Sequence, residues 1–144
     1  MLNGMIRTCS GCGQQNRLPA ARLGDSPRCG SCKRPLSPPA EPLDVDSAEF
    51  HEITRSAKVP VLVDFWAEWC GPCHMASSEV KRVARDLAGR ALVLKVNTEQ
   101  QPDIAGLFDV RGIPNFLVMK NGRKVFQQAG LVDHKEMRRW LETA

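Results

Sequence analysis

The sequence predicts an α/β domain with a mixed central sheet covered by helices on both faces, preceded by a small cysteine-rich module. Three observations carry this prediction. Strand-like and helical hydrophobic patterns alternate through residues 43–144, as they do in sheets covered by helices. Four of the six cysteines stand in two Cys-x-x-Cys pairs ahead of that region. Four prolines between Pro35 and Pro42 separate the two parts.

Residues 1–34 are predicted to form a zinc-binding module. Cys9 and Cys12 are separated by sixteen residues from Cys29 and Cys32, which suits coordination of one zinc by four thiolates. The metal would supply the folding free energy that so short a ribbon cannot obtain by burying apolar surface. Two disulfides, formed in an oxidising compartment, and an iron–sulfur cluster are the alternatives.

Residues 35–42 are predicted to be a linker. Proline fixes φ and lacks a backbone donor, so four prolines in this stretch exclude a helix or a central strand. The linker should be extended and semi-rigid. It divides the chain into the module of residues 1–34 and a domain over residues 43–144, and we expect the two parts to fold independently.

The domain should begin with an edge strand, a helix and a buried strand. The edge strand is expected near Leu43. Asp46 and Glu49 have the spacing of a capping box, which predicts the start of a helix. The nearly continuous apolar run over residues 61–66 is typical of a central strand buried on both faces.

A second helix is expected from near Cys73 to a stop at Gly89, because apolar residues recur on one helical face between them. Another buried strand should cover residues 91–96. Pro102 suits the first turn of a short helix after that strand.

The last elements are a hairpin and a helix. Asn121 and Gly122 form a strong hairpin signal. Asp133 and Glu136 have the spacing to cap a final helix. The hairpin strands are expected over residues 115–119 and 124–128.

Cys70 and Cys73 are the predicted redox pair. The start of a helix presents free N–H groups and a partial positive charge, which lower the pKa of a thiol placed there. Cys70, at the exposed end, should attack, and Cys73, one turn inside, should resolve the mixed disulfide. Half of a zinc site and a purely structural disulfide are the alternatives.

Asp64 and Lys95 are charged residues within otherwise apolar strands. Desolvation raises the pKa of a buried carboxyl, so Asp64 beneath the cysteine pair would take and return the proton of Cys73. Lys95 would be its counter-ion. In the alternative reading, either side chain points to solvent from a strand edge.

These residues resemble the thioredoxin family. The segment VDFWAEWCGPC at residues 63–73 matches it nearly residue for residue, with further matches at residues 95–97, 111–114 and 120–122. The resemblance covers residues 43–144. It implies the thioredoxin fold, reduction of disulfide-containing protein substrates, recharging by a thioredoxin reductase, and no bound organic cofactor. The order of zinc module, linker and domain resembles the bacterial thioredoxin 2 type.

By the same resemblance, Ile113–Pro114 should be a cis peptide that faces the cysteines and leaves neighbouring backbone free to pair with an extended substrate. Of Trp66 and Trp69, one should be buried and one partly exposed. The resemblance also implies a shallow docking groove, formed by Trp69, Gly71, Pro72, Ile113 and Gly130.

Three residues depart from the family pattern. His74 and Ser78 stand where a basic residue and a helix-kinking proline are common, and Asn115 replaces the usual threonine. We expect a straighter second helix, because the usual cause of a kink is missing. His74 should be a solvated surface residue or, alternatively, one that tunes Cys73.

Composition limits the compartment and the partners. The N-terminus lacks the apolar core of a signal peptide, and no apolar run is long enough to span a membrane, so we expect a cytosolic protein. The whole net charge of +4 falls within residues 1–43, where it would balance a four-thiolate site or attract nucleic acid. The absence of aromatic side chains from these residues disfavours nucleic acid.

Two rival functions stay open beside disulfide reduction. One is a disulfide oxidase or isomerase, and the other is a redox-sensing, nucleic-acid-binding zinc protein. Gly71 and Pro72 between the cysteines, together with the missing export signal, favour reduction.

Overall fold

The structure is a computed structural model that describes residues 5–144, so residues 1–4 of the predicted zinc module lie outside the described part. Within that part, the main sheet is mixed and has five strands. These strands are β3 (Leu43–Asp44), β4 (Val61–Trp66), β5 (Leu92–Asn97), β6 (Asn115–Lys120) and β7 (Arg123–Ala129).

The strands lie in the order β3-β5-β4-β6-β7. Strands β3 and β4 pair in parallel with β5, whereas β6 runs antiparallel to β4 and β7. The central strand β4 is buried from Val61 to Phe65, as its apolar sequence predicts. Asn121 and Gly122 both adopt positive φ, which confirms the predicted hairpin turn between β6 and β7.

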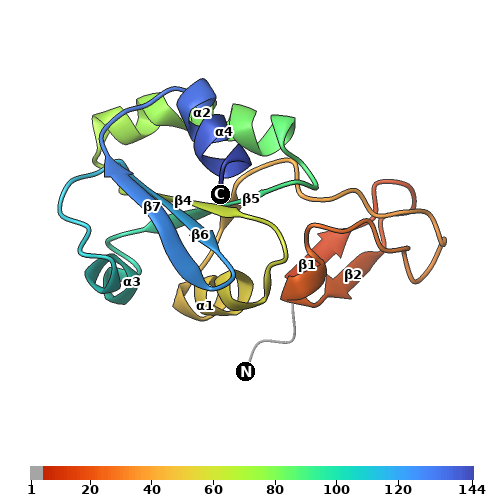
Figure 1. Cartoon of the computed structure of the whole chain (residues 1–144). Coiled ribbons are helices and arrows are strands. Elements are labelled where there is room, and N and C mark those ends of the chain that lie inside the picture. The colour runs from red at the N-terminus through yellow and green to blue at the C-terminus, as the bar shows by residue number, and fades with distance from the viewer. Residues whose placement is uncertain (1–4) are drawn as a thin grey trace.

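Helices cover both faces of the sheet (Figure 1). Helices α1 and α3 lie on one face, and α2 and α4 on the other, so that each face has its own apolar core. The predicted mixed sheet with helices on both faces is confirmed. The bounds are α1 (Ser47–Ser56), α2 (Gly71–Asp86), α3 (Pro102–Leu107) and α4 (His134–Glu142).

The helix caps follow the sequence closely. Asp46 accepts the N–H of Glu49 at 2.8 Å, and the Glu49 carboxylate accepts the N–H of Asp46 at 3.0 Å. Helix α2 begins at Gly71, two residues before Cys73, because Cys70 is its N-cap. It runs uninterrupted to Asp86 and ends before Gly89, whose φ of +83° lies in the turn into β5.

The N-terminal module contains a hairpin that hydrophobic periodicity did not reveal. Strand β1 (Met5–Thr8) pairs antiparallel with β2 (Gln15–Leu18), and a short 3-10 helix, η1 (Ala20–Arg22), follows. These strands are too short to show a pattern, and their own core is small. It consists of Cys9, Leu18, Cys29 and Leu36.

The module also packs against the domain, contrary to the expectation that the two parts fold independently. Ala20 and Leu23 are buried in the same core as Phe50 and Ile53 of α1. Leu23 keeps only 1% of its surface exposed. The linker therefore does not hold the two parts at a distance, because apolar burial favours their contact.

The contact lies at the end of the sheet where β4 and β5 begin. Gly24 lies against Val59, just before β4, and Gly89, just before β5, lies against Pro38 of the linker. Cys70 follows the other end of β4. Since β4 has 6 residues, about 20 Å separates the two ends, and the module is remote from the cysteine pair. Figure 1 shows β1 and β2 on the opposite side of the molecule from the start of α2.

Leu23→Ala should lower the free energy of the domain's main unfolding transition by about 2–5 kcal/mol, the usual cost of such a truncation in a packed core. Urea unfolding followed by far-ultraviolet circular dichroism measures it. Leu107→Ala is the matched control, because Leu107 is 62% exposed. Equal stability of the two variants would show that the module does not share the domain's core in solution.

Candidate active site and metal centre

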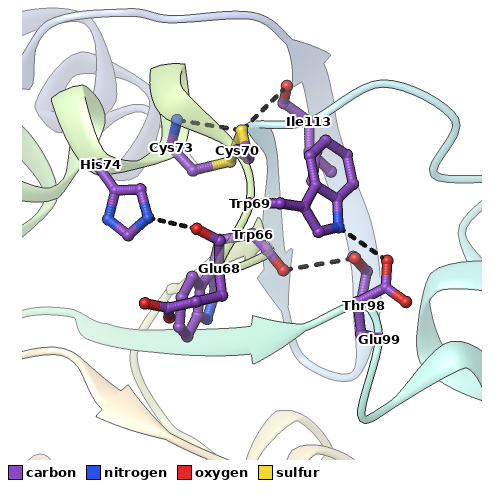
Figure 2. The surroundings of a disulfide bond; sticks show 9 residues. All are labelled: Trp66, Glu68, Trp69, Cys70, Cys73, His74, Thr98, Glu99 and Ile113. Atoms are coloured by element: carbon purple, nitrogen blue, oxygen red, sulfur yellow. Dashed lines mark hydrogen bonds between the residues drawn. A yellow bond between two sulfur atoms is a disulfide. The ribbon is translucent and has the colours of Figure 1, made fainter.

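The cysteine pair lies at the junction of β4 and α2 (Figure 2). Cys70 and Cys73 form a disulfide, with their Cα atoms 5.2 Å apart. Cys70 is the N-cap of α2, and its Sγ accepts the backbone N–H of Cys73 at 3.2 Å. A negative charge that develops on this sulfur is stabilised by that donor and by the helix dipole.

Cys70 is less accessible than the sequence predicted. It exposes only 3% of its surface, against 4% for Cys73, so the expectation of an exposed attacking cysteine is wrong for this disulfide form. The loop before β6 covers it, and Cys70 Sγ lies 3.7 Å from the carbonyl oxygen of Ile113. The exposed fraction therefore does not indicate which sulfur attacks. The hydrogen bond does, because the N–H of Cys73 donates to Cys70 Sγ.

The Ile113–Pro114 peptide is cis, as expected from the resemblance, and it lies beside the disulfide. The N–H of Gly130 donates to the carbonyl of Pro114 at 2.8 Å, and Gly130 has a φ of +102°, which favours glycine. A Cβ atom added to Gly71 or Gly130 would meet no atom within 4 Å. The backbone is thus uncrowded at these two glycines.

Trp69 stands beside the disulfide and is 70% exposed. Its indole Nε1–H donates to Glu99 Oε1 at 3.0 Å, which fixes the ring (Figure 2). The sequence analysis missed Glu99. Its position just after β5 could have predicted it, because β4 and β5 are parallel and the carboxyl ends of neighbouring parallel strands lie side by side. Trp66 is only partly buried, so the expected pairing of one buried and one partly exposed tryptophan is not found.

His74 is exposed, as expected for a surface residue, but its ring also makes specific contacts. Its Nε2 lies 2.7 Å from the carbonyl oxygen of Glu68, and a contact with a carbonyl requires the proton to be on Nε2. The ring also packs edge-on against Trp66, with centroids 6.4 Å apart. His74 therefore ties the first turn of α2 to the loop that carries Trp69.

Asp64 is buried in β4 with 2% of its surface exposed. Burial raises the pKa of this carboxyl from 3.8 to about 7, Lys95 opposes the rise, and Asp44 adds to it. Among the described residues, its Oδ1 has no hydrogen-bond partner. A buried carboxyl that titrates near neutral pH is suited to proton transfer, and the alternative of a solvent-facing Asp64 is excluded.

Lys95 pairs with Asp64 in the β4–β5 register, but its ammonium takes another partner. Lys95 Nζ lies 4.4 Å from the centre of the Trp66 ring, in a cation–π contact. The charge of Lys95 still lowers the pKa of Asp64, so the role of counter-ion stays a prediction, although the two side chains form no salt bridge.

The second site lies in the N-terminal module and consists of four cysteines. The sulfur atoms of Cys9, Cys12, Cys29 and Cys32 all lie within 4.8 Å of one another. The pairs Cys9–Cys32 and Cys12–Cys29 are separated by 3.6 and 3.7 Å. Tetrahedral zinc with Zn–S bonds of about 2.3 Å places its ligands about 3.8 Å apart, whereas a disulfide needs about 2.05 Å. The spacing of the four thiols thus fits a metal site rather than two disulfides.

The surrounding backbone favours thiolates at this site. An N–H from Cys32 lowers the pKa of Cys29 to about 6, with help from Asn16 and Ser31. N–H groups of Cys12 and Gly11 lower the pKa of Cys9. Since the thiolate is the form that ligates a metal, these donors favour binding at Cys9 and Cys29. Cys32 differs, because an N–H from Arg34 is outweighed by burial and by contacts with the other cysteines, which raise its pKa to about 11.

A family model described as Thioredoxin matches residues 41–143 of the chain. The chain belongs to the thioredoxin family. A second model, described as the N-terminal part of Thioredoxin 2 and as a zinc ribbon, matches residues 8–34. The resemblance stated from the motifs is thus confirmed in both parts.

Individual thioredoxins agree with this assignment. Thioredoxin C-3 from Corynebacterium nephridii is 35% identical over 138 residues, covering 96% of this chain and 94% of the relative. Thioredoxin 1 from Chlorobaculum tepidum is 42% identical over 87 residues, or 60% of this chain and 86% of the relative. The solved structure of a mutant thioredoxin from Halobacterium salinarum is 32% identical, with a TM-score of 0.68, and covers 73% of this chain and 91% of its own.

Asp64→Asn should stabilise the fold at pH 8 and have little effect at pH 4. The pKa of Asp64 is raised from 3.8 to about 7, so the native state binds more protons than the unfolded state between these values. The stability of the natural chain relative to the variant should therefore fall as the pH rises through this window. At pH 8 the gain should be on the order of 4 kcal/mol, because each unit of pKa shift corresponds to about 1.4 kcal/mol.

Urea unfolding of the oxidised proteins between pH 4 and pH 8 measures this difference. Asp109→Asn is the control, because the Asp109 side chain is 76% exposed and should leave the pH dependence unchanged. A constant difference between Asp64→Asn and the natural chain would rule out a raised pKa.

Proposed function

We propose that this thiol–disulfide oxidoreductase reduces disulfides in protein substrates and is recharged by a thioredoxin reductase. The observation that supports the proposal best is the Cys70–Cys73 disulfide at the start of α2, with a backbone donor on Cys70 Sγ. That donor favours a thiolate at Cys70 when the pair is reduced, and the thiolate is the nucleophile in disulfide exchange.

The proposed reaction proceeds through one mixed disulfide. The Cys70 thiolate attacks a substrate sulfur, the substrate S–S bond breaks, and the leaving thiolate takes up a proton. Cys73 then loses its proton and attacks Cys70 Sγ, which releases the second substrate thiolate. The substrate gains two electrons and the cysteine pair loses two. A reductase that draws on NADPH returns them.

Asp64 is the proposed acceptor of the Cys73 proton, and the charge of Lys95 lowers the pKa of Asp64. A base works best when its pKa lies near the operating pH, and the pKa of Asp64, raised by burial to about 7, meets this condition. Asp64 returns the proton when the pair is reduced again. Pro114 keeps a donor-free backbone position next to the pair.

The proposed substrate groove consists of Trp69, Gly71, Pro72, Ile113 and Gly130. The exposed indole offers an apolar surface, and the open positions at both glycines let a substrate backbone approach closely. An extended chain bound here would pair with free backbone groups next to Pro114. The sulfur of Cys70, although little exposed, lies 3.7 Å from the carbonyl oxygen of Ile113 and would thus be next to a substrate bound in this groove.

We also propose that the metal held by Cys9, Cys12, Cys29 and Cys32 is zinc, with a structural role. The fit of the sulfur spacings to tetrahedral coordination supports it. The division into residues 1–34, 35–42 and 43–144 is proposed as the domain organisation, with the packing of Leu23 as a link between the parts. Four thiols kept unpaired at such short range fit a reducing compartment, and we propose the cytoplasm.

Cys73→Ser should trap mixed disulfides between Cys70 and substrate, since attack proceeds and resolution does not. Cys70→Ser should have no measurable turnover. The assay is insulin-disulfide reduction with NADPH and a thioredoxin reductase, with covalent adducts detected by non-reducing electrophoresis and mass spectrometry. Release of both substrate thiols by Cys73→Ser at the natural rate would contradict the two-cysteine mechanism.

The purified chain should contain one zinc, and Cys29→Ala should lose it while Cys73→Ser keeps it. The reason is that each of the four thiolates supplies one ligand, and the redox pair supplies none. Elemental analysis gives the ratio. Peroxide should release the metal to a colorimetric chelator, because oxidised thiols no longer bind it. Iron with sulfide in the purified chain, or zinc retained by Cys29→Ala, would overturn this assignment.

A further inference from the structure

Three charged side chains are aligned across the sheet. The register pairs Asp44 of β3 with Lys95 of β5, and Lys95 with Asp64 of β4. Directly paired residues in neighbouring strands have their side chains on the same face, so one lysine stands between two carboxyls. Asp64 is buried, whereas Asp44 is exposed at the sheet edge.

Lys95 is reached from solvent through a pocket of about 520 Å³. Strand β3, the linker and α2 form its walls. Their charged groups around Lys95 are Glu41, Asp44, Lys81 and Arg85. Glu41 lies 3.8 Å from Arg7 of the N-terminal module, which leaves Asp44 as the carboxylate that stands next to Lys95 in the sheet.

The ammonium of Lys95 forms a salt bridge with neither Asp44 nor Asp64. It lies over the ring of Trp66, two residues beyond Asp64 on the same strand face. A single cation at this position stabilises the ionised form of Asp64. Asp44, on the other side of the lysine, attracts the same cation and repels a negative charge on Asp64.

We propose that Asp44 is a positioning residue of the redox site, which weakens the stabilisation that Lys95 gives to the ionised Asp64. The inference rests on the proposed role of Asp64 as the proton acceptor. The direction agrees with the charge of Asp44, which adds to the raised pKa of Asp64. Asp44 thereby keeps the carboxyl able to hold a proton near neutral pH, although Asp44 itself touches neither cysteine nor substrate.

Asp44→Asn should lower the midpoint of the Asp64 titration by about 0.3 to 1 pH unit. Two strand spacings place the carboxyls about 10 Å apart. Coulomb's law then gives this range for effective dielectric constants between that of water, about 80, and about 25. Carbon-13 NMR of the side-chain carboxyls follows the titration in the oxidised chain, with Asp64→Asn identifying the signal. Asp44→Glu should restore most of the shift, and high salt should reduce it.

Glu142→Gln is the matched control. It removes one exposed carboxylate from α4, whose Trp140 packs on Phe126 of β7, at the sheet edge opposite β3, and it should leave the midpoint unchanged. An unchanged midpoint in Asp44→Asn, or an equal shift in Glu142→Gln, would overturn the role of Asp44 alone. The absence of any Asp64 titration between pH 5 and 9 in the natural chain would overturn both this role and that of Asp64.

Discussion

The direct passage from β4 into α2 is the constraint on which the redox site depends. Strand β4 lies at the centre of the sheet, held by parallel pairing to β5 and antiparallel pairing to β6. The chain after it has only four residues before α2 begins at Gly71. Cys70 is therefore fixed at a helix N-terminus, between the residues that follow β5 and those that precede β6. Glu99 and Ile113 reach the site from these two neighbours.

Local patterns predicted most of the fold, because they act within a few residues. The capping box at Asp46, the turn at Asn121 and the apolar run of β4 each determine one element without help from the rest of the chain. The spacing of the six cysteines likewise separates a metal site from a redox pair. What the sequence could not predict depends on distant contacts. The low exposure of Cys70 comes from a loop over forty residues away, and the cation–π contact of Lys95 depends on the register of two strands.

The N-terminal module is stabilised in two different ways, which explains how it can be so small. The four thiolates and their metal would hold the β1–β2 hairpin and the turn after Pro27. Leu23 is buried in the core of the domain, so the domain covers part of the module's apolar surface. Because this contact lies at the opposite end of β4 from Cys70, the module is placed to affect the domain through stability rather than by touching the cysteine pair.

The burial of Asp64 lowers the stability of the fold but gives the site a carboxyl with a raised pKa. A buried carboxyl without a hydrogen-bond partner on Oδ1 is costly when ionised, and a lysine in contact would remove much of that cost. Such a contact would also lower the pKa of the carboxyl and make it a poor base at neutral pH. Holding the ammonium over Trp66, 4.4 Å from the ring centre, avoids this outcome while keeping the positive charge nearby. The arrangement is thus less stable than an ion pair would be, and for that reason it suits the proposed role of a carboxyl that binds and releases a proton in every cycle.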